Sequence, residues 1–351
     1  MTLCVGSSTA GKTSDYGLRF FSLDEKTGQL KLLAQGAQGR SPTYVVFGNG
    51  LIYGLDERQE GGALDAYAWK HGEPVKYLGG CELPGGSMCH LTLLPGGQYL
   101  TVSSYGTGSQ IICKLDKDGI PASMSMLEQH EGVGFDSKDR QDGPHVHFSA
   151  VAPGNDRILV TDLGLDSVSV YRLDDDNGVM IKDIEENQVY TEPGSGPRHL
   201  TFSADGRFWY LVTELNSHVL AFSYDKATGR SNLIEEKPML PHGFDKYNIA
   251  SDIHLSPDGK FLYAANRGLN DVVCYSVDAE SGSITLCGRY GIHCSMPRTF
   301  AVSEKYLVAA GQGDNKVVVL PRDCTTGALS DAVCELSISG AAYVGFFPDF
   351  C

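Results

Sequence analysis

A turn that recurs along the chain constrains the fold more than any other feature of the sequence. In each copy an Asp stands four residues before a Gly, at the end of a run in which apolar residues alternate with others. Glycine readily adopts the positive φ that closes a short hairpin loop, so each copy predicts a β-hairpin. The copies occupy residues 24–28, 174–178, 225–229, 278–282 and 323–327.

A second glycine turn, Pro-Gly-Gly, Pro-Gly or Asp-Gly, precedes the first turn in each unit. The step from Gly206 to Gly259 is 53 residues, and so is the step from Gly229 to Gly282. The runs between these turns are short and rich in Val, Leu, Tyr and Phe, which favours β-strands over amphipathic helices. Each unit therefore predicts a four-stranded antiparallel meander, and the period is close to that of a propeller blade.

The units account for the whole chain as one closed ring. Three strand-like runs before the first unit and one run at residues 341–347 complete a further blade. We therefore predict an all-β fold, a single domain over residues 1–351. It is a seven-bladed β-propeller of four-stranded antiparallel blades, in which the N- and C-terminal strands share one blade. Closure removes exposed sheet edges, and two stacked β-sandwiches would not explain the repeat. The six continuous units begin near Pro42, Ser87, Pro144, Pro197, Ala250 and Pro297.

Composition narrows the function classes. The chain has 28 Lys and Arg against 43 Asp and Glu, a net charge of −15, which argues against nucleic-acid binding. It shows no basic leader with an apolar run and no long apolar segment, so we expect neither a secretory signal nor a membrane span. The ten cysteines form no CxxC pair, which suits reduced thiols and a cytoplasmic location.

Ionisable residues gather where the blades would meet the central channel. In a meander the start of the first strand and the end of the second lie at the same rim. A concave pocket with convergent ionisable groups is the expected site for a small ligand. The alternative is that Arg198 pairs with Glu214 or Asp162 only to hold neighbouring blades together. The rim positions carry His145, His147, Asp162, Arg198, His199, Glu214, Asn216, Asp252, His254, Asn266 and Arg267.

Several of these residues stand in motifs that resemble the lactonase family of seven-bladed propellers. The motifs are Gly-Pro-Arg-His-Leu-Thr-Phe at 196–202, Glu-Leu-Asn-Ser at 214–217, His-Val-His at 145–147, Asp-Leu-Gly at 162–164 and Asn-Arg-Gly at 266–268. That family includes propeller-type 6-phosphogluconolactonases and the fungal 3-carboxy-cis,cis-muconate lactonizing enzyme. The resemblance covers nearly the whole chain and is strongest from 144 to 282. The chain departs from the pattern at Ser104, where relatives often have Asn, and in a polar insertion at 128–142.

The resemblance implies hydrolysis of a sugar-acid lactone without metal or cofactor. The leading substrate is 6-phospho-D-glucono-1,5-lactone, opened to 6-phosphogluconate in the pentose phosphate pathway. The proposed site of one His, two Arg and one Glu falls on His147, Arg198, Glu214 and Arg267. Six further residues are expected to bind substrate: His145, His199, Asn216, Asp252, His254 and Asp162.

The expected roles follow from the chemistry of a lactone. Glu214 is the candidate general base, or alternatively it orients Arg198 as an ion pair, and His147 shares proton transfer. Arg198 and Arg267 would hold a phosphate or carboxylate and stabilise developing negative charge.

Competing functions remain open at the level of the sequence. The same four residues would serve a muconate-type cycloisomerase, and a propeller can be a non-catalytic scaffold. Residues 6–13 match the phosphate-loop pattern, but a strand-like run follows where a helix is needed, so we interpret them as a strand connection. Calcium prefers a shell of oxygen ligands, and the arginines among the rim residues would repel a cation, so we expect no metal ion at the rim. We expect a monomer that binds a small anionic lactone, with no nucleic-acid or membrane partner.

Overall fold

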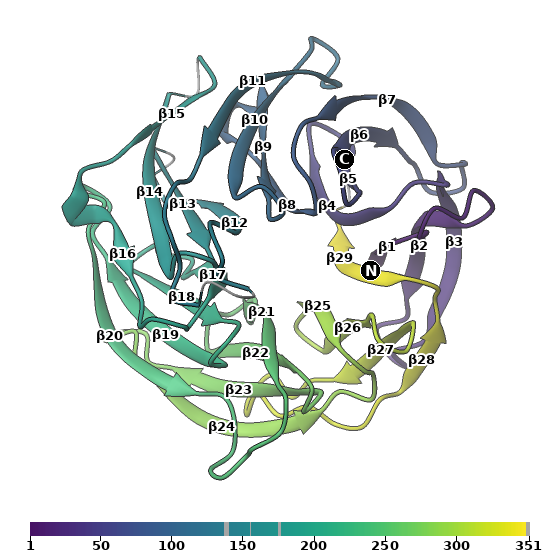
Figure 1. Ribbon diagram of the computed structural model, residues 1–351. Helices are drawn as coiled ribbons and strands as arrows, with labels where there is room; N and C mark the ends of the chain where they lie inside the picture. Colours follow the sequence, from purple (N-terminus) through teal and green to yellow (C-terminus); the bar gives the residue numbers. More distant parts are fainter. Residues whose placement is uncertain (137–139, 155, 175–176, 349–351) are drawn as a thin grey trace.

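Seven antiparallel β-sheets stand around a central axis like the blades of a propeller (Figure 1). The computed structural model describes residues 1–136, 140–154, 156–174 and 177–348. Within these residues no helix is long and apolar enough to cross a membrane. The fold class predicted from the repeat is confirmed.

The blades follow one another along the chain, and in blades 2 to 7 the strands run outward from the channel in chain order. Blade 1 holds β29 (Ala341–Phe347), β1 (Thr2–Ser7), β2 (Tyr16–Leu23) and β3 (Leu30–Gln38). Blade 2 holds β4 (Pro42–Gly48), β5 (Leu51–Glu57), β6 (Gly62–Ala68) and β7 (Lys76–Leu83). Blade 3 holds β8 (Met88–Leu93), β9 (Tyr99–Ser104), β10 (Ser109–Leu115) and β11 (Pro121–Gln129), with a 3-10 turn, η1, at Pro95–Gly97.

The other four blades repeat the pattern. Blade 4 holds β12 (Val146–Val151), β13 (Arg157–Asp162), β14 (Ser167–Asp174) and β15 (Val179–Lys182), with η2 (Glu185–Asn187) and a short fifth strand, β16 (Val189–Tyr190). Blade 5 holds β17 (Pro197–Phe202), β18 (Phe208–Thr213), β19 (His218–Tyr224) and β20 (Ser231–Pro238). Blade 6 holds β21 (Ile249–Leu255), β22 (Phe261–Arg267), β23 (Asp271–Val277) and β24 (Ile284–Gly291). Blade 7 holds β25 (Pro297–Val302), β26 (Tyr306–Gly311), β27 (Lys316–Pro321) and β28 (Cys334–Ser337).

The two ends of the chain close the ring as predicted. β29 pairs antiparallel with β1, with Leu3 opposite Phe346 and Val5 opposite Val344. Leu3 and Val5 then pack against Val308 and Val317 of blade 7 in one buried cluster. Blade 1 therefore joins the last blade to the first through both main-chain pairing and apolar packing.

The repeated Asp-x-x-x-Gly turn, present in five of the seven blades, packs against the neighbouring blade. In blade 6 the Asp278 carboxylate accepts hydrogen bonds from the main-chain N–H groups of Glu280 and Ser281, and Gly282 adopts a φ of 73°. A Cβ at Gly282 would come within 2.3 Å of the Phe208 ring in blade 5. The hydroxyl of Tyr210, also in blade 5, donates to the Gly282 carbonyl at 3.1 Å. The period in the sequence therefore follows from a packing contact between blades.

Each innermost strand carries a β-bulge near its start, which positions the site. A bulge inserts one extra residue into a strand. The side chain of this residue does not follow the regular alternation between the two faces of the sheet and points in a new direction. The added residue is Thr43 in β4, Cys89 in β8, His147 in β12, Arg198 in β17 and Arg298 in β25. In β21 the shift spans Ser251 and Asp252, and in β29 it falls at Ala342.

Candidate active site

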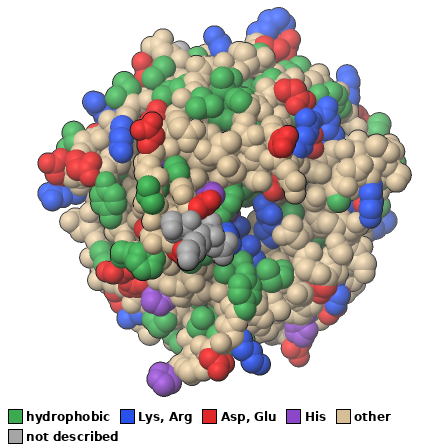
Figure 2. Space-filling view, in the orientation of Figure 1, with side chains coloured by type: hydrophobic (Ala, Val, Ile, Leu, Met, Phe, Trp, Pro, Cys, Tyr) green, Lys and Arg blue, Asp and Glu red, His purple; other side chains and the backbone are tan. Residues whose placement is uncertain are grey.

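A buried carboxylate contacts three arginines near the central channel of the ring. We call the mouth of this channel the funnel. Glu214 is 1% exposed, and its Oε2 atom lies 2.7 Å from Arg198 Nε and 2.6 Å from Arg267 Nη2. Its Oε1 atom lies 2.6 Å from Arg140 Nη2. Figure 2 shows Lys or Arg side chains in the hollow at the centre of this face of the ring. Three guanidinium groups therefore contact one carboxylate.

These charges set the protonation of Glu214. Burial alone would raise the pKa of its carboxyl, but Arg267, Arg198 and Arg140 outweigh burial and lower that pKa to about 2. Burial and the nearby Arg267 lower the pKa of Arg198 to about 10, so this guanidinium stays charged at neutral pH. A carboxylate of such low basicity is a poor proton acceptor. The geometry therefore favours the ion-pair role for Glu214 over the general-base role.

Main-chain contacts between blades 5 and 6 hold this cluster. The N–H of Glu214 donates to the Gly196 carbonyl at 2.7 Å, and the Glu214 carbonyl accepts from the Ala250 N–H at 2.9 Å. Arg267 Nη2 donates to the Ala250 carbonyl at 2.7 Å, and Arg198 Nη1 donates to the Ser251 carbonyl. Arg198, Glu214 and Arg267 thus converge as the sequence predicts.

Arg140 is a member of the cluster that the sequence did not reveal. It belongs to the insertion at 128–142, of which residues 137–139 lie outside the described residues. Arg140 Nε donates to the Tyr105 hydroxyl at 2.8 Å, and its guanidinium stacks 5.5 Å from the centre of the Tyr105 ring. The ring of His145, an expected substrate-binding residue, stacks on the Tyr105 ring, with the two ring centres 4.4 Å apart. The insertion therefore contributes a third guanidinium to Glu214.

Arg298 is a further arginine close to the cluster that the sequence did not reveal. It is the bulge residue of β25, and its Nη2 lies 3.3 Å from Glu57 Oε2 of blade 2. Its charge contributes to lowering the pKa values of Arg198 and His147, so it faces the same funnel. The repeat offered a signal, because Pro-Arg at 297–298 stands in the register of Pro-Arg at 197–198.

Two buried imidazoles lie beside the arginines. Burial, followed by Arg198, holds the pKa of His147 well below 6.5, and the same two causes lower the pKa of His199 to about 4. Both rings are therefore neutral at neutral pH, and their centres lie 5.2 Å apart. His199 Nδ1 donates to Asp252 Oδ1 at 2.8 Å. His147 Nδ1 and His199 Nε2 are buried without a hydrogen-bond partner among the described residues.

His254 occupies a deeper level than the sequence predicts. It stands four residues beyond Ala250 on β21, roughly 13 Å along the strand. Its Nε2 lies 3.0 Å from Asp252 Oδ2, and it lines a cavity of about 210 Å³ with Tyr44 and Tyr343. None of the arginines of the cluster lines that cavity. Asp252 lies between His199 and His254, and the binding of substrate by His254 stays a prediction.

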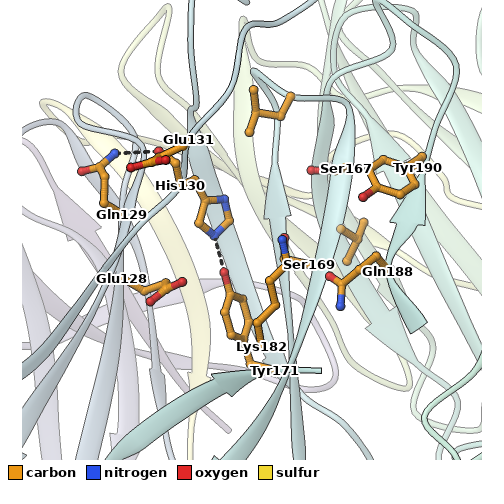
Figure 3. A pocket seen from close by; sticks show the side chains of 12 residues that line it. Glu128, Gln129, His130, Glu131, Ser167, Ser169, Tyr171, Lys182, Gln188 and Tyr190 are labelled. Carbon is orange, nitrogen blue, oxygen red and sulfur yellow. Dashed lines mark hydrogen bonds between the residues drawn. The ribbon is translucent and has the colours of Figure 1, made fainter. Parts of the chain in front are cut away.

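Asp162 holds the insertion and does not line the funnel. It is fully buried, and its Oδ1 accepts hydrogen bonds from the N–H groups of His145 and Leu165. Its Oδ2 lies 2.7 Å from His130 Nδ1, and His130 Nε2 lies 2.9 Å from the Tyr171 hydroxyl, in a cavity of about 300 Å³ shown in Figure 3. Both oxygens of Asp162 thus serve protein groups, and its contact with substrate stays a prediction.

The remaining expectations concern Asn216 and metal binding. Asn216 lies in the turn after β18, where its Oδ1 accepts a hydrogen bond from the Thr213 hydroxyl. Within the described ranges, no three His, Cys, Asp or Glu side chains group in a way that could hold a metal ion.

The closed seven-bladed ring and its central cluster of guanidinium and imidazole groups can be compared with those of known proteins. The family model described as "Lactonase, 7-bladed beta-propeller" matches residues 2–346. The chain therefore belongs to this lactonase family, and it is an enzyme of the lactonase type. The resemblance inferred from the motifs is confirmed.

Three relatives illustrate how far the similarity extends. A protein of Bacillus subtilis named 6-phosphogluconolactonase is 29% identical over 93% of this chain and 92% of its own length. A Formosa agariphila protein of the same name is also 29% identical, over 98% of both chains. The structure of a periplasmic gluconolactonase from Pseudomonas aeruginosa is 28% identical, covers 99% of both chains and superposes with a TM-score of 0.92.

Proposed function

We propose that this enzyme hydrolyses 6-phospho-D-glucono-1,5-lactone to 6-phosphogluconate. The observation that carries the proposal is the excess positive charge of Arg140, Arg198 and Arg267 around one carboxylate, in a chain whose net charge is −15. Guanidinium groups bind phosphate and carboxylate through paired charge-assisted hydrogen bonds. A phosphorylated sugar lactone supplies an anion for this pocket, and the names of the Bacillus and Formosa relatives support the same substrate.

In this proposal Arg198, Arg267 and Glu214 act through charge, and His147 transfers a proton. Arg198 and Arg267 hold the anion and stabilise the negative charge that develops on the carbonyl oxygen when water attacks. Glu214 orients these guanidinium groups, and Arg140 is the third guanidinium in contact with it. The ring C–O bond of the tetrahedral intermediate then breaks, and the released oxygen takes a proton to become a hydroxyl.

His147 is the proposed general base. Asp252 accepts the Nδ1–H of His199, which leaves His199 Nε2 as an acceptor. We assign the proton of the neutral His147 ring to Nδ1, so that Nε2 can take a proton from the attacking water. The positive charges nearby lower the pKa of His147 in the free enzyme. A bound anion offsets these charges and raises that pKa, so the base becomes stronger when substrate is present.

A panel of lactones tests the proposal. Purified protein is assayed with 6-phosphogluconolactone, unphosphorylated gluconolactone and carboxymuconate, each with and without a chelator, after subtraction of spontaneous hydrolysis. We expect the phosphorylated lactone to give the largest kcat/KM, unchanged by the chelator. Turnover of carboxymuconate alone would indicate a cycloisomerase, and inertness toward every compound would indicate a scaffold.

Arg140→Ala tests the role of the insertion in substrate binding. Loss of a hydrogen bond to a charged group is worth about 1.5–3 kcal/mol, so we expect KM for the phosphorylated lactone to rise roughly 10- to 100-fold. The change in kcat should be smaller, because Arg198 and Arg267 still contact Glu214. Arg172→Ala, on the exposed side of blade 4, is the matched control and should leave both constants unchanged. Equal KM values for Arg140→Ala and the wild type would remove Arg140 from the site.

Pathway, location and oligomeric state stay predictions. The pentose phosphate pathway follows only if the phosphorylated lactone is the substrate. The cytoplasmic location rests on the cysteine pattern, and the Pseudomonas relative is named as periplasmic. Light scattering after size exclusion tests the expected monomer.

A further inference from the structure

Two cysteines from neighbouring blades meet outside the funnel. Cys81 lies on β7, the outermost strand of blade 2, and Cys113 lies on β10 of blade 3. Their sulfur atoms are 3.2 Å apart. Cys113 is fully buried in the apolar cluster between the two blades, and Cys81 is half-buried at the edge of that cluster.

We propose that Cys81 and Cys113 form a reversible modification site, a disulfide that joins blade 2 to blade 3 when the protein meets a small-molecule disulfide such as oxidised glutathione. A disulfide has an S–S distance of about 2.05 Å, so the sulfurs must approach by roughly 1 Å. Side-chain rotation and small shifts of two packed strands can supply this movement. The proposal does not depend on the lactonase reaction.

The surroundings give the two thiols different roles. The hydrogen bond from the Cys113 thiol is the main reason that the pKa of Cys81 is lowered, whereas the same contact and burial raise the pKa of Cys113. The thiolate is the nucleophile in disulfide exchange, and access to solvent is also required. Cys81 meets both conditions better than Cys113. Cys81 is therefore the attacking thiol, and Cys113 is the resolving thiol.

The exchange balances in two steps. The Cys81 thiolate attacks one sulfur of oxidised glutathione, the S–S bond of glutathione breaks, and one glutathione thiolate leaves. The Cys113 thiol loses its proton to solvent and attacks the Cys81 sulfur, which releases the second glutathione thiolate. Two protein thiols are oxidised and one glutathione disulfide is reduced to two thiols. Excess thiol reverses both steps.

Mass spectrometry of the full chain after incubation with oxidised glutathione tests the site. Trypsin leaves Cys81, Cys89 and Cys113 in one peptide, because no Lys or Arg occurs from residue 77 to residue 113. Cleavage after Glu82 and after Tyr99 separates the three cysteines. We expect a linked pair of peptides containing Cys81 and Cys113, lighter by two hydrogens than the reduced pair, that disappears with dithiothreitol. Exposed Cys324 should carry glutathione instead and reports access of the reagent.

Variants distinguish the resolving thiol from general reactivity. Cys113→Ala should leave Cys81 joined to glutathione, and Cys81→Ser should leave Cys113 unmodified while Cys324 still reacts. If Cys113→Ala does not fold, the Cys81→Ser result and the wild-type peptide map still show whether Cys81 and Cys113 form a disulfide. In the wild type, oxidation should also raise the midpoint of thermal unfolding, because the cross-link restricts the unfolded chain. A stable Cys81–glutathione adduct in the wild type, or two free thiols where Cys324 is fully modified, would overturn the proposal.

Discussion

Glu214→Gln is expected to destabilise the protein by about 3–5 kcal/mol. The substitution keeps the shape of the side chain and removes the negative charge that Arg140, Arg198 and Arg267 share. Breaking a buried ion pair from one side typically costs about 3–5 kcal/mol, because the remaining charge stays buried without compensation. A drop from an ordinary pKa of about 4.5 to about 2 corresponds to about 3 kcal/mol, in the same range. Denaturant unfolding at neutral pH measures the loss.

The pH dependence of this loss identifies its cause. The folded-state pKa of Glu214 lies below the value in the unfolded chain, so its contribution is complete above the unfolded value and declines as pH falls toward about 2. The difference in unfolding free energy between wild type and Glu214→Gln should therefore shrink through this acid window. Glu82→Gln removes an exposed partner of Arg58 and should cost less than about 1 kcal/mol. A Glu214→Gln protein as stable as the wild type would contradict the ion-pair role.

Activity separates the two roles considered for Glu214. As an anchor of the arginines it affects substrate binding, so Glu214→Gln should raise KM for the phosphorylated lactone together with a fall in kcat/KM. Phosphate or sulfate should restore part of the lost stability, because an added anion binds the uncompensated guanidinium groups. A fall in kcat alone, with KM unchanged, would instead support the general-base role.

The fold was predictable because the signal is a repeat, whereas the site was only partly predictable. The five Asp-x-x-x-Gly turns mark contacts between neighbouring blades, as Gly282 shows against Phe208. The convergence of Arg198, Glu214 and Arg267 followed from strand order alone. Arg140 could not be found in this way, because it comes from an insertion that lies outside the repeat and reaches Glu214 from another blade.

Bulges place several side chains where the alternation of a regular strand would not. Two residues of β21, Ser251 and Asp252, stand opposite the single residue Ala265 of β22, and His254 lies two positions beyond Asp252, further along the strand from the rim. Arg298 owes its place in the funnel to the corresponding bulge in β25. A bulge leaves little trace in a single sequence, because it depends on pairing with the next strand and not on the residue itself. Alignment of one repeat with the next locates these bulge residues better than the alternation within one strand does.

His147→Gln is expected to lower kcat by about 10²- to 10⁴-fold, the range typical of a lost general base. KM should change little, because the substrate anion is held by the arginines. Asp252→Asn should act through His199, whose tautomer it would no longer fix, and should lower kcat by a smaller factor. His242→Gln, at an exposed position, is the control for both variants. Wild-type kcat in His147→Gln would exclude His147 as the base.

The pH profiles of the wild type should show that substrate strengthens this base. The profile of kcat/KM reports the free enzyme, in which burial and Arg198 hold the pKa of His147 well below its ordinary value. The profile of kcat reports the complex, in which the bound anion offsets part of the arginine charge. The acidic limb of kcat should therefore lie at higher pH than the limb of kcat/KM. With unphosphorylated gluconolactone, which brings no anion, the two limbs should coincide. Coincident limbs with the phosphorylated substrate as well would mean that the arginines and His147 act independently.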